Sequence, residues 1–335
     1  GSVDPWTIKK REIQQTNFLG QSVFQDHYTL FKNQFFPTFR SSQEFGEFVA
    51  MKYIKGVDEV LEHFADDYPE LYQSSEELKL KCLQNNLRLL DMNVKHLGTD
   101  KNFLTMKNLI TALQEQGVDL LHFYDCQNIE KYDDKYILNY HNGEKIYAEK
   151  VIIATGRSGA NFVADICRSF GIKMSSNHID IGVRVEMKDV IWKEFSDKIY
   201  EPKILYKTKT FEDRCRMFCF NKGGLVSAEN NHGIITANGH SYAEDKKRTE
   251  NCNFAILSSI RFTEPFNQPT EYAESISRLA NMIGKGSVIV QRFGDLIRGR
   301  RSTQSRIDEA FITPTLQATP GDLSLVLPKR ILDGI

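Results

Sequence analysis

The residues best placed to do chemistry follow a short apolar run near the middle of the chain. Val151, Ile152 and Ile153 are β-branched and predict a buried strand, which then breaks into Ala154–Gly159. Small residues at the carboxyl end of a buried strand let a ligand approach the backbone closely. The segment therefore predicts a ligand contact, and an ordinary strand followed by a glycine turn explains it equally well.

Other polar segments offer side chains suited to binding or proton transfer. His240 follows a glycine, and an imidazole titrates near neutrality, so it is a candidate proton carrier, although a lone histidine is more often structural. Residues 298–306 hold four arginines, which could clamp phosphates or carboxylates or simply form a solvated loop. The 95–100 loop could touch a phosphate or ribose, with Lys95 or His96 assisting, or only cap the next helix through Thr99 or Asp100.

Periodicity predicts the elements that position these residues. Helices are expected over 44–64, from a cap at Ser74-Ser75 to about 90, and over 104–116 with a C-cap at Gly117. A strand over 118–123 and a hairpin of 135–140 with 144–147, turning at Asn142-Gly143, then lead to the Val151 strand. This gives a helix, a strand, a hairpin and a strand.

The second half predicts a mostly antiparallel sheet. Helices are expected over 162–170 and 272–283, a short strand over 287–292, and a basic loop over 294–306. Asp180 and Arg184 could pair across the exposed face of the 178–186 strand. The other expected strands cover 216–220, 225–228, 234–236 and 251–257. We therefore expect a mostly helical region over 1–90, a region of mixed helix and strands over 91–160 and an antiparallel domain over 161–335.

Composition limits the class of protein. The chain has 335 residues, of which 41% are hydrophobic and 26% charged, and its net charge is −1. This balance is typical of a soluble globular protein and argues against a nucleic-acid partner. No apolar run is long enough to span a bilayer. The six cysteines form no C-x-x-C pair and have no zinc-finger spacing, so we expect reduced thiols, no metal site and a cytoplasmic location. Gly1-Ser2 is typical of an expression-tag remnant.

Taken together, several motifs resemble a family of bacterial, mostly uncharacterised FAD-dependent dehydrogenase-like proteins. The resemblance covers roughly residues 85–335. It rests on His96–Asp100, Ala154–Gly159, Asp180–Glu186, Phe218-Cys219, Gly223-Gly224, Asn238–Ser241, Gly321-Asp322 and Leu327-Pro328. It implies a glutathione-reductase-like fold: residues 91–160 would be part of an FAD/NAD(P)-binding, Rossmann-like α/β domain with a β-meander, joined to the antiparallel substrate domain over 161–335.

The resemblance also implies roles for individual residues. Ala154, Thr155, Gly156, Arg157 and Cys126 would contact FAD, and Gly223 and Gly224 would border the flavin ring. Asn238, Arg298, Arg300 and Arg301 would hold the substrate, a small and possibly anionic molecule, or the phosphate of NAD(P)H. His240 would carry the proton, and Cys219 is either a thiol beside the flavin or, more commonly, a small core residue.

The chain departs from the family pattern in three places. It has no G-x-G-x-x-G turn, it stops before the family's terminal Gly-Asp segment, and Asn221 and Lys222 replace a second cysteine and a proline. We therefore expect the central part of a flavin oxidoreductase without its terminal FAD-binding segments. A non-catalytic substrate- or partner-binding module is the alternative, and an RNA-modifying flavoprotein would need an exposed basic face. The oligomeric state stays open.

Overall fold

A computed structural model describes residues 43–90, 93–156, 158–263, 265–266 and 268–335, and the chain divides into two compact units. Unit 1 comprises residues 1–70 and 101–175, and unit 2 comprises residues 71–100 and 176–335. The architecture is mixed α/β with mainly antiparallel sheets, as the sequence predicted at that level. In the described part of the chain, no helix combines the length and the apolar character needed to cross a bilayer.

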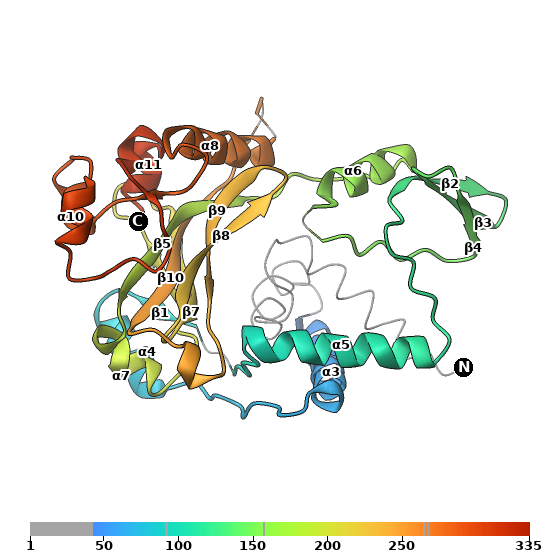
Figure 1. Cartoon of the computed structure of the whole chain (residues 1–335), viewed down its shortest axis with the longest axis horizontal. Helices are drawn as coiled ribbons and strands as arrows, with labels where there is room; N and C mark the ends of the chain where they lie inside the picture. The colour runs from blue at the N-terminus through green and yellow to red at the C-terminus, as the bar shows by residue number, and fades with distance from the viewer. Residues whose placement is uncertain (1–42, 91–92, 157, 264, 267) are drawn as a thin grey trace. The chain divides into compact units, whose positions relative to one another are not determined.

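Unit 1 consists of helices and a three-stranded meander (Figure 1). The predicted hairpin is confirmed: β3 (Lys135–Tyr140) pairs with β4 (Lys145–Ala148) through a turn in which Gly143 has φ +85°. The third strand, β2 (Cys126–Tyr132), was not predicted. The predicted helices form as α3 (Gln43–Phe64), α5 (Thr99–Glu115), which starts in unit 2, and α6 (Ala160–Ser169).

Two predicted strands of unit 1 are wrong. Gly117 closes α5 with φ +80°, and the amide of Val118 then bonds back to the Leu113 carbonyl, which turns the chain away from an extended path. Phe123 has φ +64°, a left-handed conformation that lies outside the extended region of a regular strand. Residues 151–153 pair with no strand among the described residues, and Ile152 is 41% exposed. The Rossmann-like sheet is therefore not part of what the structure describes.

Unit 2 is built on an antiparallel sheet with the strand order β1-β6-β7-β10-β5 (Figure 1). The strands are β1 (Arg88–Leu89), β5 (Ile179–Lys188), β6 (Ile204–Lys207), β7 (Arg214–Asn221) and β10 (Asn251–Ile260). Side chains alternate between the two faces. One face is apolar, since Met217, Phe254 and Val185 belong to the same core cluster.

Helices cover the apolar face at both ends (Figure 1). At one end, α4 (Glu76–Gln84) inserts Leu78 and Cys82, and α7 (Lys193–Ser196) packs beside it. The Ser75 hydroxyl caps α4, as predicted, but the helix ends earlier than expected. At the other end, α8 (Pro269–Ile283) and α11 (Lys329–Leu332) pack on Ile181. Ordinary apolar burial therefore stabilises this face of the sheet.

The opposite face of the sheet is polar and lies beneath a separate hairpin. This hairpin is formed by β8 (Leu225–Asn231) and β9 (Ile234–His240). In register across the sheet, Ala255 lies between Phe218 and Arg184. The predicted pairing of Asp180 with Arg184 is wrong: Asp180 forms an ion pair with Arg216 on β7. The polar face therefore positions the charged side chains from which a site can be built.

The remaining elements follow the sheet in sequence. The pair β11 (Ile289–Val290) and β12 (Thr319–Pro320) is the only parallel one among the described strands. Residues 294–306, predicted as a loop, contain α9 (Phe293–Ile297) and α10 (Gln304–Asp308). The hydroxyl of Thr303 caps α10, a local signal that arginine-rich composition hides.

Candidate functional site

The structure joins two polar segments that the sequence analysis singled out separately. The loop before α5 and the end of β9, 141 residues apart at their contact, meet within unit 2. Thr99 donates its amide to the Ser241 carbonyl at 3.1 Å, and its hydroxyl lies 3.5 Å from His240 Nδ1. His96 Nε2 lies 3.0 Å from the Ser241 hydroxyl. Two histidines and two hydroxyls therefore form a compact polar group.

Asp100 holds this junction together. Its carboxylate accepts hydrogen bonds from the amides of Ala243, at 3.0 Å, and Glu244, at 3.2 Å, just beyond β9. Gly98 has φ +88°, and a Cβ there would lie 2.7 Å from Asp100 Oδ1. Glycine therefore permits both the turn and the close approach. Asp100 was predicted as a possible helix cap, but it fastens a distant loop instead.

Aromatic side chains support His96 from beneath. The Tyr200 ring stacks on the His96 ring with centroids 4.2 Å apart, and Tyr72 packs against Tyr200 at 5.1 Å. The Tyr200 hydroxyl lies 3.1 Å from the Ser241 hydroxyl. Burial raises the pKa of Tyr200 far above its ordinary value, so the phenol stays protonated. The stack thus fixes the imidazole plane of His96.

His240 has the electrostatic setting of a neutral imidazole. Burial lowers its pKa first, and the positive charge of Arg184 lowers it further. At neutral pH the ring is therefore uncharged and able to accept a proton. In the tautomer whose Nδ1–H donates to Thr99, the Nε2 atom is the accepting nitrogen. The predicted role of His240 is chemically feasible at this position.

A network of polar side chains lies next to His240 on the sheet. Arg184 Nε donates to Asn253 Oδ1 at 2.9 Å, and its Nη2 donates to the Cys219 carbonyl at 2.9 Å. Asn221 Nδ2 donates to the same carbonyl at 2.9 Å. Asn253 is fully buried, and no described residue forms a hydrogen bond with its Nδ2. The network fixes the charge of Arg184 close to His240.

Cys219 lies in a β-bulge of β7. The register shifts there, since Asn253 faces Asn221 whereas Ala255 faces Phe218, and Cys219 itself has φ +57°. Its amide donates to the Glu201 carboxylate at 2.7 Å, which helps to stabilise the strained backbone. Bulges commonly re-aim a side chain at a functional site. The bulge is consistent with either role predicted for Cys219.

The predicted glycines shape the turn between β7 and β8. Gly223 has φ +59°, and its carbonyl accepts the Thr249 amide at 2.8 Å, while the Thr249 hydroxyl donates to the Gly224 carbonyl at 2.7 Å. A Cβ at Gly224 would lie 2.5 Å from the His240 carbonyl. Gly224 therefore lets the turn approach the backbone of His240. Asn238, in contrast, donates to Glu229 across the hairpin at 2.9 Å.

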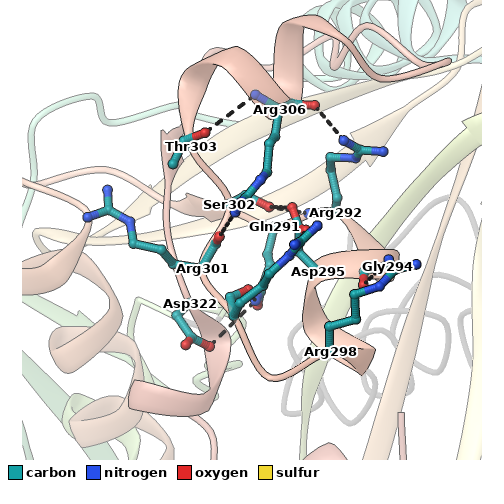
Figure 2. A network of polar contacts seen from close by, with 11 residues as sticks. Gln291, Arg292, Gly294, Asp295, Arg298, Arg301, Ser302, Thr303, Arg306 and Asp322 are labelled. Carbon is teal, nitrogen blue, oxygen red and sulfur yellow. Dashed lines mark hydrogen bonds and ion pairs between the residues drawn. The ribbon is translucent and has the colours of Figure 1, made fainter.

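Figure 2 shows that most of the predicted arginine clamp bonds within its own segment. Arg300 forms an ion pair with the buried carboxylate of Asp295 at 2.7 Å, and Arg298 donates to the Gly294 carbonyl at 2.9 Å. Arg301 is exposed and forms no hydrogen bond or ion pair through its guanidinium with the described residues. Of the three arginines predicted to bind substrate, only Arg301 keeps its guanidinium unbonded in this part of the chain.

The remaining predicted residues belong to unit 1. Cys126 opens β2, and burial, followed by the charge of Asp125, raises the pKa of its thiol. Ala154, Thr155 and Gly156 lie on an irregular segment, where Gly156 has φ +67°. Arg157 lies outside the described residues. The structure therefore places these cofactor candidates in a different unit from His240.

Sequence reasoning missed the Tyr200 stack and the Arg184–Asn253 network. Asn251 and Asn253 alternate with apolar residues in β10, a period-two signal that one face of this strand is polar. In the described part of the chain, no three His, Cys, Asp or Glu side chains gather closely enough to hold a metal ion. No protein-family model matches the chain, and no curated protein matches its sequence.

Proposed function

We propose that the chain forms the substrate side of an FAD-dependent oxidoreductase acting on a small molecule, with NAD(P)H as a candidate electron donor. The contact between Thr99 and His240 carries this proposal. It joins two of the motifs that the sequence resemblance assigns to such proteins, and it positions a neutral imidazole among fixed hydrogen-bonding groups. The flavin, when bound, supplies the hydride chemistry.

One loop in unit 1 has the features of a dinucleotide contact. A Cβ at Gly159 would lie 2.0 Å from Thr155 Oγ1, so only glycine lets this threonine pack there. Gly156 has open space within 4 Å of its would-be Cβ. The N-cap residue of α6 is Gly159, which has no side chain to bond the amides of the first turn. These amides are therefore suited to a phosphate. Ala154, Thr155 and Gly156 would therefore hold the nucleotide part of FAD.

The residues of unit 2 would handle the proton that accompanies hydride transfer. His240 would accept or return this proton at Nε2, while the Thr99 hydroxyl holds Nδ1. Burial, together with the nearby charge of Arg184, lowers the pKa of His240 and favours the neutral imidazole between turnovers. His96, stacked on Tyr200 and bonded to Ser241, would act as a positioning residue for the end of β9.

The test is retention of FAD by the purified chain. We expect a flavin absorption band that stays with the protein through gel filtration after FAD is added. Gly156→Ala should weaken retention, whereas Gly171→Ala should not. The two glycines are matched, with φ +67° and +65° and no heavy atom within 4 Å of either would-be Cβ. Both variants therefore carry the same backbone strain.

Catalysis is tested on the flavin-loaded protein by NADPH oxidation with an artificial electron acceptor. His240→Gln should lower kcat and remove the limb of the pH profile that reports the imidazole. A protein that never retains FAD, or a His240→Gln variant with full turnover and an unchanged pH profile, would overturn the proposal.

A binding module without redox chemistry is the second candidate function. It is favoured by the irregular path of residues 151–156, which belong to no sheet among the described residues. It is the reading that remains if the chain binds no flavin. The RNA-modifying alternative has less support, because Arg300 and Arg298 bond within their own segment.

A further inference from the structure

Lys203 is a buried lysine that has no counter-ion among the described residues. It directly precedes β6 and is 5% exposed. Its ammonium lies 5.8 Å from the ring centroid of Phe218, and no ion pair or side-chain hydrogen bond joins it to the described residues. Lysine is almost never buried unless it is paired, because removing an ammonium from water is costly. The position therefore calls for a negative charge that the described residues do not supply.

Arg216 is a second cation beside Phe218, and one of its hydrogen-bond donors has no acceptor among the described residues. Its guanidinium carbon lies 4.7 Å from the centroid of Phe218, which is itself 4% exposed. One terminal nitrogen pairs with Asp180, but the Nε atom is buried and has no hydrogen-bond partner in the part of the chain that the structure describes. A buried unsatisfied N–H is rare in folded proteins and usually indicates a missing acceptor. Two cations from neighbouring strands thus flank one aromatic ring, each with donor capacity left over.

Two carboxylates that could serve as counter-ions, that of Asp180 and that of Glu201, two residues before Lys203, have other partners. Asp180 accepts from Arg216, and the Oε1 atom of Glu201 accepts the amide of Cys219 at 2.7 Å. Neither of them forms an ion pair with Lys203 within 4.0 Å. The positive charge of Lys203 is therefore not cancelled by direct pairing with another described side chain.

We propose that Lys203 and Arg216 bind the anionic oxygen group of a small ligand, a carboxylate or a phosphate, beside Phe218. The ammonium and the Nε–H would donate charge-assisted hydrogen bonds to the oxygens. The Phe218 ring offers an apolar wall to the carbon atoms next to this group. The site uses none of the arginines predicted to bind substrate and no residue assigned to flavin, so it does not depend on the proposed oxidoreductase activity.

The experiment is a titration of the flavin-free chain with inorganic phosphate and, separately, with sodium succinate. Ionic strength is held constant with sodium chloride. Binding is read from thermal unfolding and isothermal calorimetry. We expect a saturable rise in Tm with one of the two anions, since a ligand that binds only the folded state stabilises it. A response to phosphate alone identifies a phosphate-bearing ligand, and a response to succinate alone identifies a carboxylate.

Two lysine variants locate the site. Lys203→Met keeps the length of the side chain but removes its charge. Because a charge-assisted hydrogen bond is lost, the apparent Kd should rise by roughly ten-fold or more. Lys207, at the end of β6, is exposed, so Lys207→Met is the control. Its apparent Kd should stay within about two-fold of the wild-type value. Lys203→Arg, which retains the charge, should keep saturable binding.

Two results would overturn the proposal. The first is the absence of saturable binding of either anion by the wild-type chain, which needs no variant to fold. The second is equal binding by Lys203→Met and the wild type. Because no flavin is present, neither result bears on FAD retention.

Discussion

Replacing Gly239 by alanine should break the polar network beside His240. A Cβ at this position would lie 1.7 Å from Arg184 Nη2 and 2.2 Å from Asn253 Oδ1. No positive φ is involved at Gly239, so the cost comes from the clash and not from backbone strain. Because the backbone of β9 is held by its pairing with β8, we expect the Arg184 side chain to be the group that moves.

The magnitude follows from the bonds that Arg184 would lose. Arg184 bonds to two acceptors: Asn253 Oδ1, through Nε at 2.9 Å and Nη2 at 2.5 Å, and the Cys219 carbonyl, through Nη2 at 2.9 Å. We count one hydrogen bond for each acceptor. Hydrogen bonds to charged groups contribute about 1.5–3 kcal/mol each, so losing both would cost roughly 3–6 kcal/mol. Partial relaxation favours the lower end, and we expect the free energy of unfolding to fall by about 3 kcal/mol. This is a large part of the ~5–15 kcal/mol of a typical domain.

Urea denaturation followed by tryptophan fluorescence measures this change in unit 2. The chain has two tryptophans, Trp6 and Trp192, and Trp192 packs against Phe220 and Phe254 in the core of unit 2. A Trp6→Phe background therefore makes Trp192 the only reporter. Gly294→Ala is the control, because its would-be Cβ meets only the flexible end of Arg298 at 3.2 Å. It should shift the free energy by less than about 1 kcal/mol.

A double-mutant cycle decides whether the clash is the cause. In an Arg184→Met background the guanidinium is already absent and only the clash with Asn253 Oδ1 remains, so adding Gly239→Ala should cost less than it does in the wild type. The difference between the two costs is the coupling free energy of the two sites. If Gly239→Ala lowers the free energy of unfolding equally in both backgrounds, a clash with the Arg184 side chain is not the cause, and the reasoning is refuted.

Two further predictions concern titratable groups. Burial tends to raise the pKa of Asp295, but hydrogen bonds from Arg300 and Ser302 outweigh it and lower the pKa below its ordinary value. The resulting stability is present above the unfolded-state pKa and lost as pH falls through the folded one, so Asp295→Asn should lower Tm at neutral pH and flatten the acid limb of a Tm–pH profile; an unchanged profile would contradict this. Arg184→Met should raise the pKa of His240, measured by NMR titration with His240→Gln to assign the signal, whereas an unchanged or lower value would exclude the proposed charge effect.

The elements with strong local signals could be predicted from the sequence. Asn142-Gly143 fixed a hairpin turn, Gly117 and Gly171 ended helices with positive φ, and Ser75 capped α4, because these signals depend on a few neighbouring residues. Periodicity alone was less reliable. The β-branched run at Val151 predicts a strand only if a partner strand is present, and the described residues offer none.

Contacts between distant segments could not be predicted in the same way. The alternation in β5 correctly separated an apolar face from a polar one, but it could not show that Asp180 pairs with Arg216 on a strand two positions away in the sheet. Likewise, the arginine-rich composition of residues 298–306 gave no sign that the carboxylate of Asp295 lies buried among them. Such pairings depend on sheet order, which a single sequence does not specify.

The same reasoning explains why the polar group around His240 was only partly foreseen. The 95–100 loop and the 238–241 segment each looked weak, because a lone histidine or a capping aspartate is common on any soluble protein. Their meeting changes this balance: Asp100 holds the backbone beyond β9 and Thr99 contacts His240. Two partly buried imidazoles add little to the stability of a protein. Here, however, glycines allow the close approach of the backbone, an aromatic ring stacks on His96, and an arginine lies near His240. Contacts that hold two histidines in place without a clear gain in stability are the physical argument for assigning function to this junction and not to the arginine segment.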